Sequence, residues 1–303
     1  MTFRSQLSAA RQLALCSLYR RPVSLGNCGA FVSFSFDDFP RSAYTSGGRI
    51  LKSRGVRGTY YAAIGLMNTV TEVGQQFCQD DLFSLIEDGH ELGSHTLNHV
   101  SSRSTPCALF LDDADRGRRA LESQTGVSAA DNFAYPFGHV TFRMKRTLGS
   151  RMLTCRSTVP GINGPQVDLN LLKANKLYGD EDRAGAALRL IDEAKKCQGW
   201  LIFYSHDVSP NPSSYGCTPS LLESVVCHAL CQGCHVMNVR DVLCEIGVGV
   251  QRSGAELAVQ EPLRGVCAPT LDPTIKPSET GDTGDSSSVI DGSYRKNLLD
   301  CRE

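Results

Sequence analysis

Two neighbouring acids, Asp37 and Asp38, directly follow the apolar segment Phe31–Phe36. From Val32 onward, apolar side chains occupy every second position of this segment, and that period predicts a β-strand with one buried face. Pro40 ends the strand shortly afterwards. Adjacent carboxylates raise each other's ionisation cost. The two acids are therefore either a solvated strand end or a pair with separate chemical tasks.

A second group of chemically active side chains lies in GHELGSHTLNHV, residues 89–100. His95 and His99 are four residues apart, a spacing that places both imidazoles on one face of a helical turn, as in pairs of histidine metal ligands. The same spacing also occurs in a polar helix face that binds nothing. Both histidines follow a short predicted strand, as the aspartates do. Because the carboxyl ends of parallel strands meet at one edge of a sheet, the four side chains are predicted to share that edge.

Two further predicted strands end in residues of chemical interest. The apolar run WLIFY, residues 200–204, leads to Ser205, His206 and Asp207. Sequence neighbours cannot align a hydroxyl, a ring and a carboxylate as a catalytic triad, so His206 alone is predicted to act, as a general acid or base. The segment FAYPFG, residues 133–138, is predicted to form a turn that presents backbone N–H groups and aromatic surface to the same edge.

The elements that must position these residues alternate in type between about residues 29 and 245. Strands are predicted at 31–36, 58–63, 91–94, 132–135, 151–155 and 201–204, with a weaker strand near 235–238. Helices are predicted at 80–87, 108–124, 142–148, 184–196 and 219–230. Repeated βα units predict an α/β fold with a mainly parallel sheet, either a barrel or a doubly wound sheet.

The length and composition of the chain predict one large domain with extensions. It has 303 residues, of which 41% are apolar and 21% are charged. We predict an N-terminal helical extension at residues 1–28 and the main domain at residues 29–247. Residues 248–303 are predicted to be a disordered tail, because much of this segment is rich in Pro, Thr, Ser, Gly and Asp.

Charge and hydropathy exclude several classes of partner. A net charge of −1 gives no electrostatic footprint for nucleic acid or for an anionic membrane. No apolar run approaches the roughly 20 residues that a transmembrane helix needs. No clear export signal is recognisable at the N-terminus, so a cytoplasmic location is predicted.

The chain contains 13 cysteines at scattered spacings, which we interpret mostly as reduced, buried small hydrophobic residues. Cys227, Cys231 and Cys234 form a cluster near two histidines. The pair Cys231 and Cys234 has zinc-ligand spacing but lacks a second such pair. A shared face of a core helix is the favoured interpretation of the cluster, and a metal or redox role is the alternative.

Four motifs in order resemble those of a known family. They are SFDD at 35–38, HTLNH at 95–99, AYPFG at 134–138 and the apolar strand that ends at His206. This pattern resembles the polysaccharide deacetylases, the nodulation-deacetylase-like carbohydrate esterase family four, over residues 30 to 240. GTYY at 58–61 is also similar to the family's second strand. The resemblance implies a distorted (β/α) barrel.

The resemblance also implies a function and roles for five residues. The chain would be a hydrolase acting on carbon–nitrogen bonds other than peptide bonds, removing N-acetyl groups from the amino sugars of a poly- or oligosaccharide. Asp38, His95 and His99 would bind a divalent metal, with Zn²⁺ the expected ion, which would activate a water molecule. Asp37 would be the catalytic base and His206 the general acid.

The resemblance further implies that the N–H of Phe137 stabilises the oxyanion and that Tyr135 offers an aromatic surface for the sugar. Two departures from the family pattern stand out. Ala134 occupies the position of an arginine that commonly pairs with the base, which leaves the level of activity open. The acidic motif that orients the acid histidine is absent, and Asp168 is the candidate substitute.

Alternative functions remain at this stage. An O-acetyl carbohydrate esterase would use the same fold and the same oxyanion. A non-catalytic carbohydrate-binding relative would keep the barrel without turnover. A phosphatase using Asp37 and Asp38 around magnesium would need basic phosphate ligands or a glycine-rich loop, and neither accompanies these acids.

Overall fold

The computed structural model describes residues 12–126 and 131–248. Most of the predicted tail and the first part of the predicted N-terminal extension therefore lie outside the described residues. Within the extension, residues 12–17 are helical and residues 22–24 form a strand. Leu15 is the buried residue of that short helix, whereas Leu18 is exposed. The domain boundaries proposed above stay predictions.

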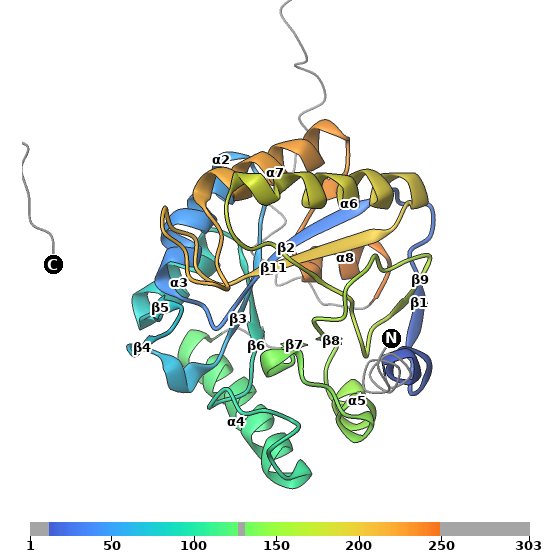
Figure 1. Cartoon of the computed structure of the whole chain (residues 1–303). Helices are drawn as coiled ribbons and strands as arrows, with labels where there is room; N and C mark the ends of the chain where they lie inside the picture. The colour runs from blue at the N-terminus through green and yellow to red at the C-terminus, as the bar shows by residue number, and fades with distance from the viewer. Residues whose placement is uncertain (1–11, 127–130, 249–303) are drawn as a thin grey trace, which may run out of the picture. The chain divides into compact units, whose positions relative to one another are not determined.

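The elements occur close to their predicted positions (Figure 1). The main strands are β2 (Phe31–Asp37), β3 (Thr59–Ala62), β6 (Glu91–Ser94), β7 (Asn132–Ala134), β8 (Thr154–Arg156), β10 (Asn175–Lys176), β11 (Trp200–Ser205) and β12 (His235–Val236). Two small antiparallel pairs are β1 (Pro22–Ser24) with β9 (Gln166–Asp168) and β4 (Val70–Thr71) with β5 (Gly74–Gln75).

Helices connect most of these strands. They are α2 (Arg49–Ser53), α3 (Gln79–Glu87), α4 (Cys107–Thr125), α5 (Phe142–Gly149), α6 (Ala184–Cys197), α7 (Pro219–Cys231) and α8 (Val239–Glu245). Short helical turns are η1 (Ala43–Gly48), η2 (Ile64–Leu66), η3 (Pro136–Gly138) and η4 (Glu181–Arg183). The sequence analysis missed α2, α8, β10 and both small strand pairs, all of which are seven residues or shorter.

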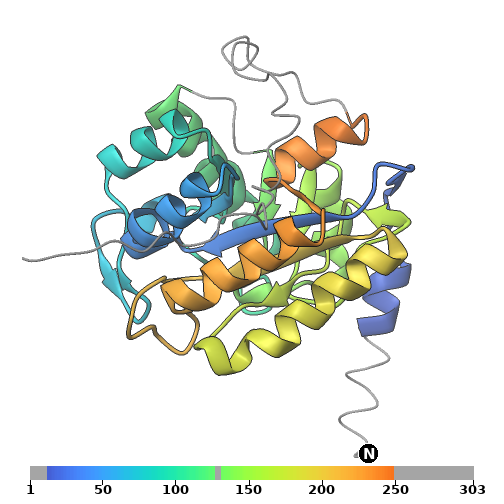
Figure 2. The ribbon, with the colours of Figure 1, turned by 90° about the horizontal axis from the view of Figure 1, so that it is seen from above.

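The main sheet is parallel and runs in the order β10-β11-β2-β3-β6-β7-β8, with β12 pairing beside one end of β2. It curves into a half-barrel and has helices on its outer face. In Figures 1 and 2, α6 and α7 lie side by side across β11 and β2. Parallel pairing places every carboxyl end of these strands at the same rim.

The alternation of side chains along β2 explains its place at the centre. Val32, Phe34 and Phe36 are buried in the outer core that β2 shares with α6 and α7. Phe31 belongs to the separate core inside the half-barrel, together with Trp200 of β11. Because both faces of β2 are buried, the whole strand is protected from water. The last residue of the inward-facing set is Asp37.

Candidate active site

The backbone turns sharply at the rim of the half-barrel. Eight non-glycine residues in the described chain have positive φ, and five of them lie just beyond the ends of β2, β6 and β7. A left-handed backbone costs an L-residue roughly 1–2 kcal/mol. Such strain persists where the surrounding structure holds it, and it concentrates at functional sites. The five residues are Asp38 (φ 61°), Phe39 (64°), Thr96 (66°), His99 (53°) and Phe137 (58°).

These turns bring Asp38, His95 and His99 together. Asp38 Oδ1 lies 3.0 Å from His99 Nε2 and 3.4 Å from His95 Nε2. The centroids of the two imidazole rings are 5.0 Å apart. Within the described residues, this is the single cluster of three His, Cys, Asp or Glu side chains with ligand atoms close enough to hold one metal ion. The three residues predicted as metal ligands are therefore neighbours in space.

The hydrogen bonds of this cluster fit a bound cation. His95 Nδ1 lies 2.8 Å from the carbonyl oxygen of Ala134. A carbonyl only accepts, so Nδ1 carries the hydrogen, and the Nε2 lone pair of the neutral ring faces Asp38. A histidine that ligates a metal commonly donates its other N–H to a backbone carbonyl in this way. Asp38 Oδ1 is buried and receives no hydrogen bond in good geometry within the described residues.

The pKa shifts of His95 and Asp38 agree with a metal site. Burial lowers the pKa of His95, and it outweighs the opposing effect of Asp38, so the ring is neutral near pH 7. Burial raises the pKa of Asp38, but the two imidazoles lower it by more, and the carboxyl group is ionised. One carboxylate and two imidazoles form a donor set that suits Zn²⁺.

Asp37 has a different partner from its neighbour. Its Oδ1 accepts a hydrogen bond from Arg156 Nη2, and the Arg156 side chain is fully buried. The guanidinium carbon lies 5.0 Å from the ring centroid of Tyr61 and 5.2 Å from that of Tyr204, so two aromatic rings flank the cation. Burial lowers the pKa of Arg156, but Asp37 raises it by more, and the arginine stays charged.

Glycine at position 93 makes room for this arrangement. A Cβ atom on Gly93 would lie 2.6 Å from the ring of Tyr61, closer than any side chain tolerates. Tyr61 pairs in register with Asp37 on one side and with Gly93 on the other. The tyrosine ring can therefore lean over β6 and still contact Arg156.

Arg156 corrects one expectation from the sequence. Ala134 indeed leaves the usual arginine position without a guanidinium, but the neighbouring strand supplies one. Ala134 and Arg156 are register partners on β7 and β8. The arginine of this chain thus lies on β8, at the position that pairs with Ala134 of β7. Its signal in the sequence was an arginine directly after the predicted strand 151–155, at the rim where the other chemical residues lie.

His206 lies beside Asp37, one position beyond the register pair of Phe36 and Ser205. Its Nδ1 is 3.2 Å from the carbonyl oxygen of Tyr215, and its backbone N–H donates to the same oxygen at 3.1 Å. Because that carbonyl only accepts, Nδ1 carries the hydrogen of this contact, and Nε2 is the other ring nitrogen. The Tyr215 carbonyl therefore orients the ring.

Asp168 does not take the orienting role that the sequence analysis gave it. Its carboxylate binds Lys145 Nζ at 2.6 Å and the backbone N–H of Arg21 at 2.9 Å. Arg21 directly precedes β1, which pairs with β9, and Lys145 lies on α5. The prediction is wrong because the sequence does not show that Lys145 and Arg21 lie beside Asp168 in the fold.

The two aromatic residues predicted at the rim have different environments. Tyr135 is 1% exposed and packs in the core beside Phe133, so it offers no surface to a sugar. Phe137 is 57% exposed, and its ring centroid is 4.4 Å from that of His99. In this turn the N–H groups of Gly138 and His139 donate backbone hydrogen bonds, and within the described residues the N–H of Phe137 donates none.

The cysteine cluster does not form a metal site in the described residues. Cys234 is buried, Cys227 is partly buried and Cys231 is exposed. The interpretation as a shared core face is therefore wrong for Cys231. Helix α7 ends at Cys231, so Cys234 lies beyond it and is buried by the following turn rather than by a helix face.

Comparison with known proteins identifies the fold. The sequence profile of the polysaccharide deacetylase family matches residues 27–152, which include Asp37, Asp38, His95 and His99. This match confirms the resemblance to polysaccharide deacetylases. No curated protein matches the sequence. None of the helices in the described residues combines the length and hydropathy that a membrane span requires.

Several solved structures are similar to this chain. One is the Xyl-CE4 domain of a multidomain xylanase from the hindgut metagenome of Trinervitermes trinervoides, at 16% identity and a TM-score of 0.50, over 73% of this chain and 93% of that one. Another is PdaA of Bacillus subtilis, a family 4 carbohydrate esterase, at 13% identity and a TM-score of 0.50, over 77% of this chain and 89% of that one. These two likenesses confirm the predicted distorted (β/α) barrel.

A third similar structure is described as a CE4 family pseudoenzyme from Bacillus anthracis. It shares 16% identity over 72% of this chain and 66% of that one, with a TM-score of 0.49.

Proposed function

We propose that this chain, which has the polysaccharide deacetylase fold, is a metal-dependent hydrolase that removes acetyl groups from N-acetylated sugars of a poly- or oligosaccharide. One observation carries the proposal. The ligand atoms of Asp38, His95 and His99 lie within 4.8 Å of one another, Asp37 ends β2, and His206 directly follows the adjacent strand β11. A carboxylate base and an oriented imidazole next to a metal site are the groups that amide hydrolysis needs.

Asp38, His95 and His99 would hold the metal ion. A divalent ion bound there supplies Lewis-acid chemistry, which polarises the acetyl carbonyl and lowers the pKa of a water molecule. Zn²⁺ is the proposed ion because two imidazole nitrogens and one carboxylate match its ligand preference. Three protein ligands leave room for water and substrate, as catalytic zinc sites require.

Asp37 is proposed as the base that takes a proton from the attacking water. Arg156 binds its Oδ1 and leaves the second carboxylate oxygen available for that proton. The buried guanidinium holds the Asp37 carboxylate through this contact. The two adjacent acids therefore have separate tasks, because one binds the metal and the other binds an arginine.

His206 is proposed to protonate the departing amine. The Tyr215 carbonyl fixes the hydrogen on Nδ1, so Nε2 is the atom that carries the transferred proton. Phe137 N–H is proposed to donate to the oxyanion that develops on the acetyl oxygen, since its turn leaves this donor unused. The exposed ring of Phe137 gives the sugar an apolar surface beside His99.

Release of acetate from an N-acetylglucosamine oligomer tests the proposal. Activity should disappear with a chelator and return when Zn²⁺ is added. Release only from an O-acetylated glycan would reassign the chain as an O-acetyl esterase. Binding of glycan without release of acetate would indicate a non-catalytic relative.

A matched variant tests the role of the base. Asp37→Asn removes the proton acceptor but no assigned ligand. Metal content should stay near wild type while turnover falls by roughly 10²–10⁴-fold. Loss of the metal in this variant would show that Asp37, and not Asp38, is the carboxylate ligand.

A further inference from the structure

The two histidines of the proposed metal site are supported in different ways. The His95 side chain is 1% exposed, and the carbonyl oxygen of Ala134 orients its ring through Nδ1. The His99 side chain is 18% exposed, and its Nδ1 has no hydrogen-bond partner within the described residues. Metal-binding histidines commonly use that second nitrogen to fix the orientation of the ring. His99 therefore needs another contact for the same purpose.

Aromatic contacts provide it. The ring centroid of Phe137 lies 4.4 Å from that of His99, with 48° between the ring planes. It also lies 5.6 Å from the ring centroid of His139, with 36° between the planes. Ring pairs at about these separations attract each other beyond the area that they bury. Phe137 thus contacts a proposed metal ligand and a further histidine that the proposed mechanism does not use.

Phenylalanine is an unusual residue for position 137. Its backbone is left-handed, with φ 58°, and 57% of the residue is exposed. Asparagine and glycine adopt this backbone conformation more readily, and a half-exposed ring gains little from burial. Its contact with His99 gives a large aromatic side chain a role in this strained turn.

One flank of the turn is held by close packing. Gly138 also has a positive φ, of 62°, and a Cβ atom there would lie 1.8 Å from Thr158 Oγ1. Only glycine fits between the turn and Thr158. The backbone that carries Phe137 is therefore fixed against the segment after β8.

The other flank is tied to the loop that carries His99. His139 Nδ1 lies 2.7 Å from Ser101 Oγ, and Ser102 Oγ donates to the His139 carbonyl oxygen at 2.6 Å. Ser101 and Ser102 follow His99 within three residues. Two hydrogen bonds thus connect the turn after β7 with the loop after β6.

The part of this loop that precedes His99 is anchored as well. Asp113 of α4 is buried, and its Oδ1 accepts from the backbone N–H groups of Leu97 and Asn98, each at 2.9 Å. The backbone on both sides of His99 is therefore held. What the backbone leaves undetermined is the rotation of the imidazole, and Phe137 is the ring packed against it.

We propose that Phe137 and His139, tied to Ser101, are positioning residues that keep the His99 imidazole in its metal-binding orientation. This inference rests on the metal site of the proposed function. It gives the aromatic ring of Phe137 a role toward the metal in addition to the surface that it offers a sugar. Because the Phe137 N–H is the proposed oxyanion donor, the same contacts fix that donor relative to the metal ligands.

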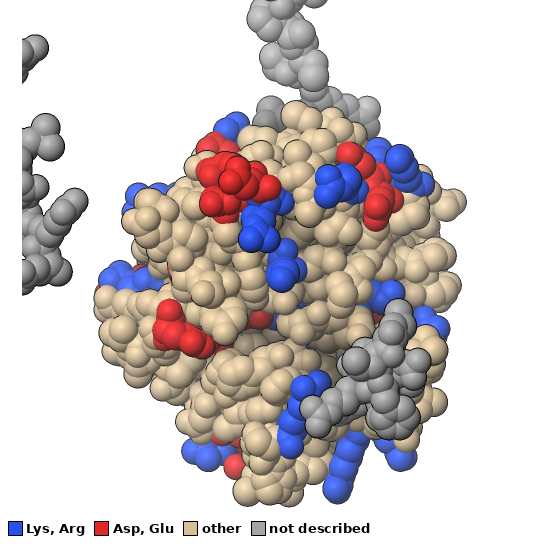
Figure 3. All heavy atoms as spheres, viewed as in Figure 1, with Lys and Arg blue, Asp and Glu red and all other residues tan. Residues whose placement is uncertain are grey.

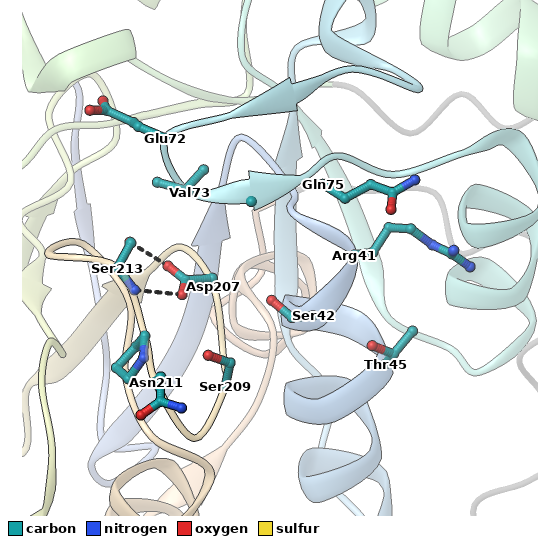
Figure 4. A pocket seen from close by; sticks show the side chains of 12 residues that line it. Arg41, Ser42, Thr45, Glu72, Val73, Gln75, Asp207, Ser209, Asn211 and Ser213 are labelled. Carbon is teal, nitrogen blue, oxygen red and sulfur yellow. Dashed lines mark hydrogen bonds between the residues drawn. The ribbon is translucent and has the colours of Figure 1, made fainter. Parts of the chain in front are cut away.

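Zinc affinity measures this role without any glycan. The described residues contain a single cluster suited to zinc, and acidic and basic side chains are interspersed on the face seen in Figure 3. A groove of about 620 Å³ between the loop after β11 and the β4–β5 hairpin contains Glu72 and Asp207 (Figure 4). Asp207 already accepts from Ser213 N–H at 2.8 Å and from Ser213 Oγ at 2.5 Å, and Glu72 points away from it. Zinc titration therefore reports on the rim cluster.

Phe137→Asn is the main variant, because asparagine tolerates the left-handed turn and removes the ring. The Kd for Zn²⁺, measured by competition with a chelating dye, should rise about tenfold, the lower end of the loss seen when a supporting contact of a metal ligand is removed. Phe137→Tyr keeps the ring and should keep the wild-type Kd. Ser101→Ala removes the tie to His139 and should raise the Kd about threefold.

Phe83→Ala is the matched control, because Phe83 is a phenylalanine of α3 that is 41% exposed. It should leave the Kd unchanged. Equal Kd values for the wild type and either Phe137→Asn or Ser101→Ala would overturn the inference, and so would an equal loss in Phe137→Tyr. If Phe137→Asn does not fold, Ser101→Ala decides alone.

The outcomes also separate this inference from the proposed function. Zinc affinities in the expected order, without acetate release from any substrate, would refute the deacetylase and leave the inference standing. Acetate release with equal zinc affinities would do the reverse. A wild type that binds no Zn²⁺ would overturn both the metal site and the inference.

Discussion

Two buried carboxylates of the half-barrel differ in how they are satisfied. Glu91, at the start of β6, accepts from Thr59 Oγ1 at 2.8 Å, from the N–H of Arg240 at 3.0 Å and from the side-chain amide of Asn132. Asp38, just beyond the end of β2, has a buried Oδ1 that no donor reaches in good geometry within the described residues. Glu91 is 0% exposed and Asp38 is 8% exposed.

The backbone conformations of Glu91 and Asp38 also differ. Glu91 sits in a regular strand, and the residues around it form a closed polar layer that also holds the start of α8. Asp38 sits in a left-handed turn, with a φ of 61°. Such strained backbone conformations concentrate at functional sites. A satisfied buried carboxylate stabilises the fold, whereas the unsatisfied Oδ1 of Asp38 is an acceptor that the proposed cation would satisfy.

The largest expected effect comes from removing the metal ligands. Asp38→Asn, His95→Ala and His99→Ala should each lower bound metal from about one equivalent to a small fraction, and acetate release should collapse. Elemental analysis of purified protein beside an acetate assay measures both. Retention of a full equivalent of metal by all three variants would place the metal elsewhere.

Glu91→Gln is the counterpart at the other end of the half-barrel. Whichever oxygen the new amide NH₂ replaces, it faces at least one donor, so at least one hydrogen bond is lost in a fully buried place. The free energy of unfolding should fall by about 1–3 kcal/mol, measured by urea denaturation. Metal content and turnover per folded molecule should stay unchanged, and loss of metal would break the distinction between the two carboxylates.

A cross-strand exchange tests the displaced arginine. Arg156→Ala leaves Asp37 buried without its cation, and breaking such a pair typically costs about 3–5 kcal/mol of stability. The double variant Arg156→Ala with Ala134→Arg returns a guanidinium to the register partner of Arg156. We expect the single variant to lose at least tenfold in kcat with metal retained, and the double variant to recover part of that loss.

The outcome distinguishes positioning from mere stability. Recovery of the melting temperature without recovery of kcat would show that Arg156 is structural and does not position the base. Ala134→Arg alone is the control, because it adds a second guanidinium beside the first and should not increase activity.

The sequence predicted the elements that carry strong periodic signals. Strand β6 has the predicted bounds, and helices α3, α5, α6 and α7 differ by one residue at one end. Five rim residues were predicted because their types and spacing are unusual, and their roles stay predictions: Asp37, Asp38, His95, His99 and His206. Their proximity followed from parallel strands alone.

Residues whose roles depend on long-range pairing were not found. Arg156 acts through a register between β7 and β8 that no local pattern reveals. The Tyr215 carbonyl orients His206 as a backbone group, so its side-chain type carries no signal. Asp168 was assigned wrongly for the same reason, since Lys145, which binds it, is distant in sequence. The β4–β5 hairpin over the groove is too short for a periodic pattern.

The smallest expected effect concerns the cysteine cluster, the alternative metal site that the sequence left open. Cys231→Ser changes an exposed side chain at the end of α7. Substitutions of this kind usually change the free energy of unfolding by less than about 0.5 kcal/mol. Metal content should stay at the wild-type value, because the proposed ligands lie at the rim of the half-barrel. Elemental analysis of the Cys231→Ser and Asp38→Asn variants together measures how much metal each one binds. If both variants lose one equivalent, the chain holds a second metal that involves α7; if only Asp38→Asn loses it, the rim cluster is the metal site.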